Sequence, residues 1–147
     1  MPAMADSAYQ TTTIAASPER CWEIVTAFET YPEWARDLKE AVVRERDEDG
    51  RGVEVEFRAS ALGRSTHYTL AYDYSRAPEI MTWSMVKGDI MRAIDGMYHF
   101  QPAPSGGTEV RYDLHIELVV PLPGFVKRRA EVRILNTLRE LKIRAES

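Results

Sequence analysis

The spacing of apolar residues first predicts a strand followed by a helix. Residues 9–16 are Thr-rich and typical of a strand. Ser17-Pro18-Glu19 then has the composition of a helix start, with Ser17 as N-cap and Pro18 at the first helical position. Apolar residues follow at helical spacing: Cys21, Trp22, Ile24, Val25 and Phe28. We expect this helix to stop at Tyr31-Pro32, since a residue before proline avoids the α region, and a second short helix to start at Pro32 and carry Trp34, Ala35 and Leu38.

From about residue 39 the apolar period becomes two, which predicts strands. The predicted strands are 41–47, 51–61, 64–75, 80–87, 94–101 and 109–120. The segment 47–50 and Ser105-Gly106-Gly107 are typical of hairpin turns. Because no helix separates these strands, they should pair antiparallel.

The final predicted helix spans about residues 125–145. Its apolar stripe consists of Ala130, Ile134, Leu138, Leu141 and Ala145. An antiparallel sheet with one apolar face must cover that face, and this is the longest helix available. The sequence therefore predicts an α+β domain: a curved antiparallel sheet of about seven strands around a long C-terminal helix, with two short helices after the first strand. We expect one domain over residues 1–147, with 1–8 flexible.

Composition excludes several classes of protein. The chain has 147 residues, one cysteine and a formal net charge of −4. A single cysteine cannot form an internal disulfide, and mild acidity argues against nucleic-acid binding. There is no secretory signal and no apolar run long enough for a membrane span, so we expect a cytoplasmic protein. Three Trp, seven Tyr, four Phe and six Met make the chain rich in large apolar side chains.

Pairing residues across the predicted turns places most of these aromatics on one sheet face. Tyr72 should lie opposite Trp83, and Tyr98 opposite Tyr112. The same pairing puts Leu70 opposite Met85, Met81 opposite Tyr98, and Gly96 opposite both Trp83 and Leu114. Gly96 then leaves space beside the Trp83 indole or marks a bulge.

The chain resembles the START-like superfamily, also known as SRPBCC, Bet v 1-like or helix-grip proteins, and in particular bacterial polyketide cyclase/dehydrase-type and coenzyme-Q-binding START proteins. The segments that carry the resemblance are 17–19, 28–34, 80–84, 96–102 and 120–125. The resemblance implies a helix-grip fold with a hydrophobic cavity between the sheet and the C-terminal helix. It does not specify the ligand, because one fold hosts many functions.

We expect a hydrophobic small molecule, such as a lipid, an isoprenoid quinone or a polyketide, to bind in this cavity. The predicted ligand-binding residues are Trp34, Phe57, Tyr68, Leu70, Tyr72, Trp83, Met85, Tyr98, Tyr112, Leu114, Phe125, Ile134 and Leu138. Inward tyrosines need partners for their hydroxyls, and methionines adapt to varied guests, which favours a cavity. The alternative is that the same side chains fill a solid core.

Catalysis has few candidates. His67, His99 and His115 should lie on the outer sheet face, with His115 near Asp95 and His99 near Arg111, as surface pairs. Cys21 is best interpreted as a core residue, and we expect neither a metal site nor a cofactor. If the protein is a polyketide aromatase/cyclase or dehydratase, Tyr72 and Tyr98 are the candidate catalytic residues. A tyrosine is a weak base at neutral pH, and no inward Arg, Glu or His is predicted to assist it.

Two further interpretations concern the surface. A basic cluster, Lys127 to Arg129, follows the apolar Leu122 and Phe125. This segment either binds an anionic membrane surface transiently or forms the solvent-exposed face of an amphipathic helix. Alternatively the chain is a protein-interaction module that uses the rims Tyr31–Trp34 and Leu122–Phe125.

Overall fold

Seven antiparallel strands form one curved sheet in the computed structural model, which describes residues 5–61, 64–119 and 136–147. The strands are β1 (Ala5–Ile14), β2 (Leu38–Arg46), β3 (Gly52–Ala61), β4 (Arg64–Asp73), β5 (Ile80–Gly88), β6 (Met91–Pro102) and β7 (Thr108–Leu118). Their order across the sheet is β1-β7-β6-β5-β4-β3-β2, so that β1 and β2 are the two edges. The α+β class and the meander of hairpins are therefore confirmed.

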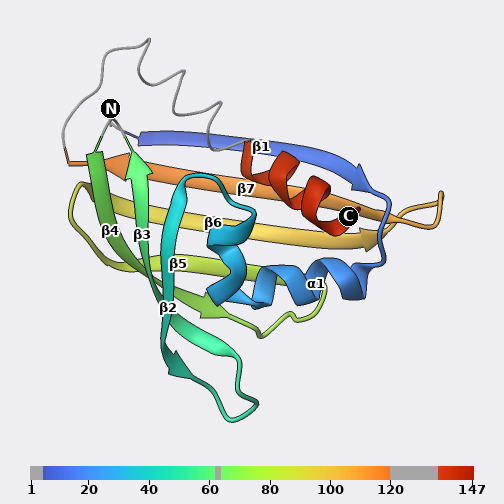
Figure 1. The fold of residues 1–147 in the computed structure, drawn as a ribbon, viewed down its shortest axis with the longest axis horizontal. Coiled ribbons are helices and arrows are strands. Elements are labelled where there is room, and N and C mark those ends of the chain that lie inside the picture. Colours follow the sequence, from blue (N-terminus) through green and yellow to red (C-terminus); the bar gives the residue numbers. More distant parts are fainter. Residues whose placement is uncertain (1–4, 62–63, 120–135) are drawn as a thin grey trace.

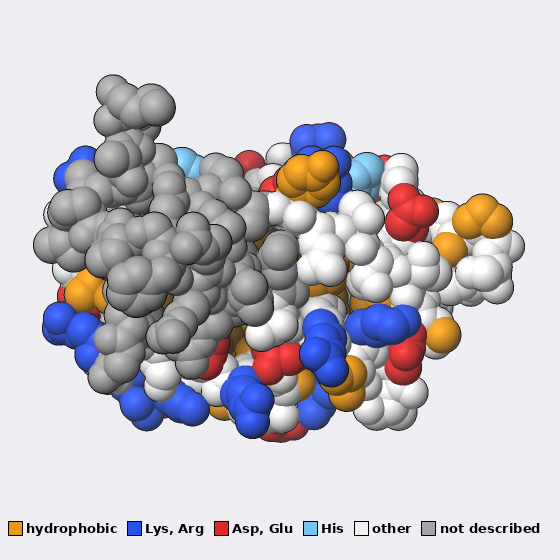
Figure 2. Space-filling view, turned by 90° about the horizontal axis from the view of Figure 1, so that it is seen from above, with side chains coloured by type: hydrophobic (Ala, Val, Ile, Leu, Met, Phe, Trp, Pro, Cys, Tyr) orange, Lys and Arg blue, Asp and Glu red, His pale blue; other side chains and the backbone are white. Residues whose placement is uncertain are grey.

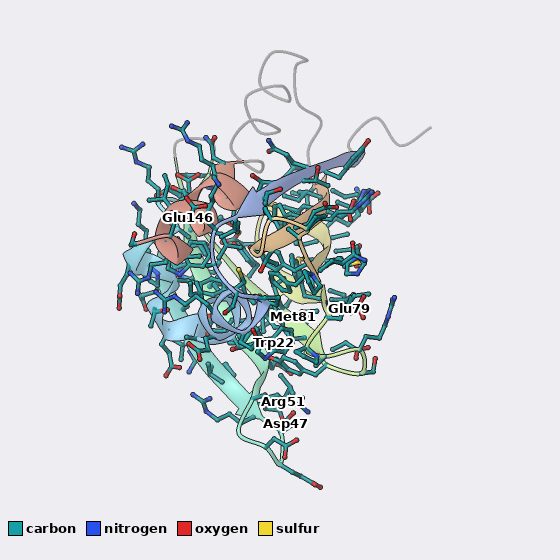
Figure 3. The ribbon with its side chains drawn as sticks, turned by 90° about the vertical axis from the view of Figure 1, so that its right-hand side faces the viewer. Trp22, Asp47, Arg51, Glu79, Met81 and Glu146 are labelled. Carbon is teal, nitrogen blue, oxygen red and sulfur yellow. The ribbon has the colours of Figure 1, made fainter. Side chains whose placement is uncertain are left out.

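The helical segments lie on one face of the sheet (Figures 1 and 3). They are α1 (Pro18–Thr26), the 3₁₀ helix η1 (Phe28–Glu33) and the described part of the C-terminal helix, residues 136–145. Contacts join α1 to β6, and η1 to β2. The inner face of the sheet is thus covered by elements from both ends of the chain.

The start of α1 is as predicted, but its end is not. The Ser17 side chain accepts a hydrogen bond from the Arg20 backbone N–H at 3.1 Å, and Pro18 is the first helical residue. α1 ends at Thr26, and η1 follows after Ala27 with Pro32 inside it. The prediction that Pro32 opens the second helix was wrong, because the chain tightens into a 3₁₀ turn before the proline. Trp34 caps η1, and Leu38 already belongs to β2.

Three strands begin at least three residues earlier than their apolar pattern predicts, and one of them is β2, which starts at Leu38. β1 starts at Ala5, so that residues 5–8, expected to be flexible, pair with β7. β6 starts at Met91, beside a register shift in its pairing with β7 between Met91 and Ala93. Pairing at a sheet edge and a register shift both depend on the neighbouring strand. The alternation of apolar residues within one strand therefore does not predict them.

The core lies between the inner sheet face and the helices. In the C-terminal helix Leu138, Leu141 and Ala145 are buried, which confirms the described part of its predicted stripe; Ala130 and Ile134 lie outside the described residues. Cys21 is fully buried, as expected of a core residue, and burial raises the pKa of its thiol.

Polar contacts fix the last turns of the C-terminal helix to β1. The Lys142 Nζ donates to the Thr13 carbonyl oxygen at 2.7 Å. The Glu146 Oε2 accepts from the Ala15 backbone N–H at 2.8 Å, and Figure 3 shows Glu146 on this helix. The end of the helix is therefore held at the end of an edge strand whose backbone groups would otherwise be unpaired.

Candidate functional site

The predicted hairpin registers are confirmed across four neighbouring strands. Tyr72 on β4 pairs with Trp83 on β5, and Trp83 pairs with Gly96 on β6. Tyr98 on β6 pairs with Tyr112 on β7. These pairings bring large side chains from separate strands together on the inner face. The pairs Leu70–Met85, Met81–Tyr98 and Gly96–Leu114 are also as predicted.

The inner face carries a continuous network of aromatic rings. Trp83 is at its centre, with ring centroids 5.8 Å from Tyr72, 5.3 Å from Tyr98 and 6.1 Å from Tyr112. Phe57 and Tyr68 contact each other at 5.6 Å on β3 and β4. The network joins residues that are far apart in the sequence because each hairpin adds one inward ring beside its neighbour.

The helical segments extend this network with aromatics that the predicted site omitted, among them Phe28 and Tyr31. The ring of Phe28 lies 4.5 Å from that of Tyr72, and the ring of Tyr31 lies 5.9 Å from that of Phe57. Tyr31 also contacts Trp34, with ring centroids 5.0 Å apart. Phe28 belongs to the predicted apolar stripe of the first helix, and this stripe already indicated that its side chain points inward. Tyr31 was assigned to a rim because the position of η1 was not foreseen.

Burial keeps the inward tyrosines protonated. It raises the pKa of Tyr72 and of Tyr98 well above the ordinary value, and neighbouring tyrosines add smaller contributions. Burial also raises the pKa of Tyr68 and Tyr112. The rings of Tyr72, Tyr98 and Tyr112 all lie beside Trp83, so these side chains share one buried region. At neutral pH each is a neutral O–H group, able to donate a hydrogen bond but not to act as a base.

The tyrosine hydroxyls differ in whether they form hydrogen bonds within the protein. Tyr31 donates to the Val25 carbonyl oxygen at 2.5 Å, and Tyr112 hydrogen-bonds the Thr137 side chain. The hydrogen bonds between described residues include none from the Tyr72 or Tyr98 hydroxyl, although neither hydroxyl is a fully buried unpaired atom. The indole nitrogen of Trp34 is fully buried and has no hydrogen-bond partner among the described residues. Polar groups of this kind in an apolar surface are typical of a small-molecule site.

A carboxylate lies close to this region, which the sequence analysis did not predict. Glu140 on the C-terminal helix accepts a hydrogen bond from the Arg36 backbone N–H at 3.1 Å. Burial raises the pKa of Glu140, and the charge of Asp37 adds to the shift. The charge of Glu140 in turn contributes to the raised pKa of Tyr98, so the two side chains are within electrostatic range. Glu140 is only partly buried and its carboxylate bonds the main chain, so the expectation that no inward acid assists the tyrosines stays a prediction.

Most predicted ligand-binding residues come together on this face, some more deeply than others. Phe57, Leu70, Tyr72, Trp83, Tyr98, Tyr112 and Leu138 are buried. Trp34, Tyr68, Met85 and Leu114 are partly buried and pack against the same core. Phe125 and Ile134 lie outside the described residues.

Gly96 does not leave the space beside Trp83 that its position suggested. A Cβ atom on Gly96 would lie 2.1 Å from Cε2 of the Trp83 indole. The pairing of Trp83 with Gly96 is regular, so there is no bulge at this point. The indole itself fills the room that the missing side chain provides.

The histidines are surface groups. His99 pairs with Arg111 and His115 with Asp95, as predicted from the hairpin registers. His99 Nε2 lies 2.9 Å from the Glu79 Oε1, a contact from the turn before β5 that strand pairing does not predict. His67 is more than half exposed and lies near Asp89.

Of the two predicted interaction rims, the one at Tyr31–Trp34 lies in the described part of the chain. Tyr31, assigned to an interaction rim, is buried and bonded to the main chain, so its side chain does not form an exposed rim. Leu122, Phe125, Lys127, Arg128 and Arg129 lie outside the described residues. On the side shown in Figure 2, the exposed hydrophobic side chains of the described residues form small separate patches. None of the described helices has the length and apolar character needed to cross a membrane.

The fold and this aromatic face define the chain as a START-like protein. Residues 5–146 match the family model described as polyketide cyclase / dehydrase and lipid transport, and the chain belongs to this family. The ligands of such proteins are hydrophobic. A search of curated proteins finds no match for the sequence.

Solved structures agree with the family assignment. A START superfamily protein from Mycobacterium smegmatis is 27% identical, with a TM-score of 0.86 over 95% of this chain and 97% of that one. The Zhui aromatase/cyclase from a Streptomyces species is 13% identical, with a TM-score of 0.80 over 97% of this chain and 94% of that one. A protein from Thermus thermophilus is 20% identical, with a TM-score of 0.78 over 95% of this chain and 97% of that one. At such low identities the last two structures support the fold alone.

Proposed function

We propose that the protein binds a hydrophobic small molecule that carries a carbonyl or similar hydrogen-bond acceptor, and that it acts as a carrier, sensor or chaperone. The site would lie between the inner sheet face and the C-terminal helix. The observation that carries this proposal is the pair Tyr72 and Tyr98, buried and protonated, without a partner among the described residues. A ligand oxygen would accept their hydrogen bonds, and the surrounding rings would cover its apolar part.

The chemistry of the face favours a neutral ligand over an anionic one. Burial works against charge in this region, as the raised pKa values of the tyrosines indicate. Besides the tyrosines, the described residue whose charge contributes to the raised pKa of Tyr98 is the acidic Glu140. A carboxylate on the ligand would therefore be repelled as well as desolvated.

Native mass spectrometry tests the proposal directly. The protein would be measured as purified, after delipidation, and after addition of 2-acetylnaphthalene, a probe with one carbonyl and two fused rings. We expect one added mass per chain, bound about two- to tenfold more weakly by Tyr98→Phe, the range that the loss of one hydrogen bond gives. Phe57→Leu, which keeps the hydroxyls, would serve as a control for packing. A wild-type protein that binds neither the probe nor any co-purified molecule would overturn the proposal.

A second candidate is a polyketide cyclase or dehydratase, for which the partly buried carboxylate of Glu140 on the C-terminal helix would be the base. Tyr98 or Tyr72 would donate to a ketone oxygen, and the Glu140 carboxylate would remove a proton from the neighbouring carbon. The resulting enolate would attack a second carbonyl of the same chain, and the alkoxide formed would take back the proton held by Glu140. Glu140 would then remove a second α-proton and pass it to the departing hydroxyl, which leaves as water. A carboxylate whose pKa is raised is a better base than an ordinary one.

The two candidates separate in a turnover assay on a linear polyketone. If the protein is an enzyme, Glu140→Gln and Tyr98→Phe should each abolish ring closure while the substrate still binds. Ring closure no faster than in buffer would exclude the enzyme and leave the binding function standing.

A further inference from the structure

Trp83 and Gly96 form the closest contact between an inward aromatic ring and the backbone of a neighbouring strand among the described glycines. A Cβ atom placed on Gly96 would lie 2.1 Å from Cε2, 2.2 Å from Cζ2 and 2.4 Å from Nε1 of the Trp83 indole. The indole therefore extends sideways from β5 and lies over the main chain of β6. A side chain of any size on residue 96 would exclude this position.

Three tyrosines hold the indole there. The rings of Tyr72, Tyr98 and Tyr112 surround Trp83, and their centroids lie within 6.1 Å of its own. An indole displaced from Gly96 cannot move further into the sheet, because the backbone of β6 is beneath it. It can move only away from the sheet, toward the helices that cover this face (Figures 1 and 3).

We infer that Gly96 and Trp83 set the size limit of the ligand site. Gly96 lets the indole lie flat against the sheet, and this determines how broad a ring system fits above it. This inference rests on the proposed function, since it assigns the specificity of that same site. A methyl group on residue 96 would overlap the indole and force it outward, which would make the site shallower. A smaller ring at residue 83 would deepen it.

A graded series of ketones tests this size limit. Acetophenone, 2-acetylnaphthalene, 2-acetylanthracene and 1-acetylpyrene each carry one carbonyl on a ring system of increasing area. Their affinities would be measured by titration for the wild type, Gly96→Ala, Trp83→Phe and the double variant. We expect Gly96→Ala to weaken binding of the broadest probe that the wild type accepts at least tenfold, and that of acetophenone less than twofold. Trp83→Phe should bind the broadest probes more tightly, relative to acetophenone, than the wild type does, and should suppress the effect of Gly96→Ala.

Gly107→Ala is the matched control. A Cβ on Gly107 would lie 2.2 Å from the Ile14 backbone oxygen, a clash similar to that at Gly96 but at the end of the β6–β7 hairpin. We expect it to lower the melting temperature without changing the order of affinities. If Gly96→Ala does not fold, the affinities of Trp83→Phe test the size limit on their own. The size limit requires that this variant prefer broader probes than the wild type does.

The outcomes distinguish this inference from the proposed function. A wild-type protein that binds no probe of the series overturns both. Binding that falls equally for all four probes in Gly96→Ala, or a preference unchanged in Trp83→Phe, overturns the size limit and leaves the binding function intact.

Discussion

The carboxylate of Glu140 accepts a hydrogen bond from the backbone N–H of Arg36, with an N···O distance of 3.1 Å. This contact joins the C-terminal helix to the segment between η1 and β2. Two charged groups of the same segment act on it: Asp37, which raises its pKa, and Arg36, which lowers it. Because burial raises the pKa of Glu140, the helix is docked through a carboxylate that is partly deprived of water.

Glu140→Gln should stabilise the protein at neutral pH. A raised folded-state pKa means that the folded chain holds this proton more tightly than the unfolded chain. The resulting stability is complete below the unfolded pKa of about 4.3 and is lost as the pH rises through the folded pKa. Glutamine keeps an oxygen for the Arg36 N–H and carries no charge. We therefore expect a higher melting temperature than the wild type at pH about 7, and no difference near pH about 4.

Glu33→Gln provides the control for this measurement. It removes one partner of the exposed pair with Arg144, and exposed pairs contribute less than about 1 kcal/mol. A neutral-pH melting temperature that falls in Glu140→Gln but not in Glu33→Gln would show that the charge of Glu140 stabilises the helix contact, contrary to our expectation.

The inward tyrosines should resist alkali until the protein unfolds. The pKa values of Tyr31, Tyr72 and Tyr98 are raised well above the ordinary value by burial. The stability associated with these raised values is present below the unfolded pKa of about 10 and is lost as the pH rises above it. Tyr74 is less deeply buried, and burial raises its pKa to about 12.

An alkaline titration followed by phenolate absorbance and by far-UV circular dichroism checks this prediction. We expect most of the phenolate signal to develop together with the loss of secondary structure. If Tyr72→Phe and Tyr98→Phe each remove signal that the wild type develops before it unfolds, these hydroxyls are in contact with water, and the apolar character of the site is wrong.

The sheet and its aromatic face were predictable because hairpin turns fix the register. Once a turn is located, each residue has one partner, and a shift by one residue would turn every inward ring outward. Tyr72, Trp83, Tyr98 and Tyr112 therefore came together correctly from the sequence. The same turns placed His99 and His115 on the opposite face.

The contacts of the helices were not predictable in the same way. Tyr31 is adjacent to a proline that was expected to break the helix, yet it lies inside η1 and donates to a carbonyl oxygen of α1. Glu140 lies between the apolar positions of its helix, where the helical periodicity predicts a solvent-exposed side chain. It is partly buried because the segment around Arg36 packs over it. Both positions depend on where another element docks, which local spacing does not encode.

Ser17→Ala should test the part of the fold that local sequence does determine. The Ser17 side chain accepts the Arg20 N–H at the start of α1, so its loss should lower the free energy of unfolding by about 1 kcal/mol. Ser17→Asp keeps an acceptor and should recover this loss. Chemical denaturation of the three proteins measures both effects, and equal stabilities of wild type and Ser17→Ala would show that the cap is dispensable.

Tyr31→Phe and Tyr72→Phe make a matched pair, since each removes one buried hydroxyl from the same aromatic network. The Tyr31 hydroxyl donates to the carbonyl of Val25, in the last turn of α1, where helix carbonyls lack intrahelical partners. Removing it leaves that oxygen buried and unpaired, which should cost roughly 1–3 kcal/mol of unfolding free energy. The Tyr72 hydroxyl has no partner in the described part of the chain, so its loss should change the stability by less than about 0.5 kcal/mol.

Urea denaturation of the ligand-free proteins measures the difference between the two variants. It must be made without ligand, because a bound molecule that uses the Tyr72 hydroxyl would stabilise the wild type and make Tyr72→Phe look destabilised. With added ligand, the stability gap between wild type and Tyr72→Phe should widen, whereas the gap for Tyr31→Phe should stay constant. If instead Tyr72→Phe is as destabilised as Tyr31→Phe without ligand, the Tyr72 hydroxyl already has a structural partner and is not available to a guest.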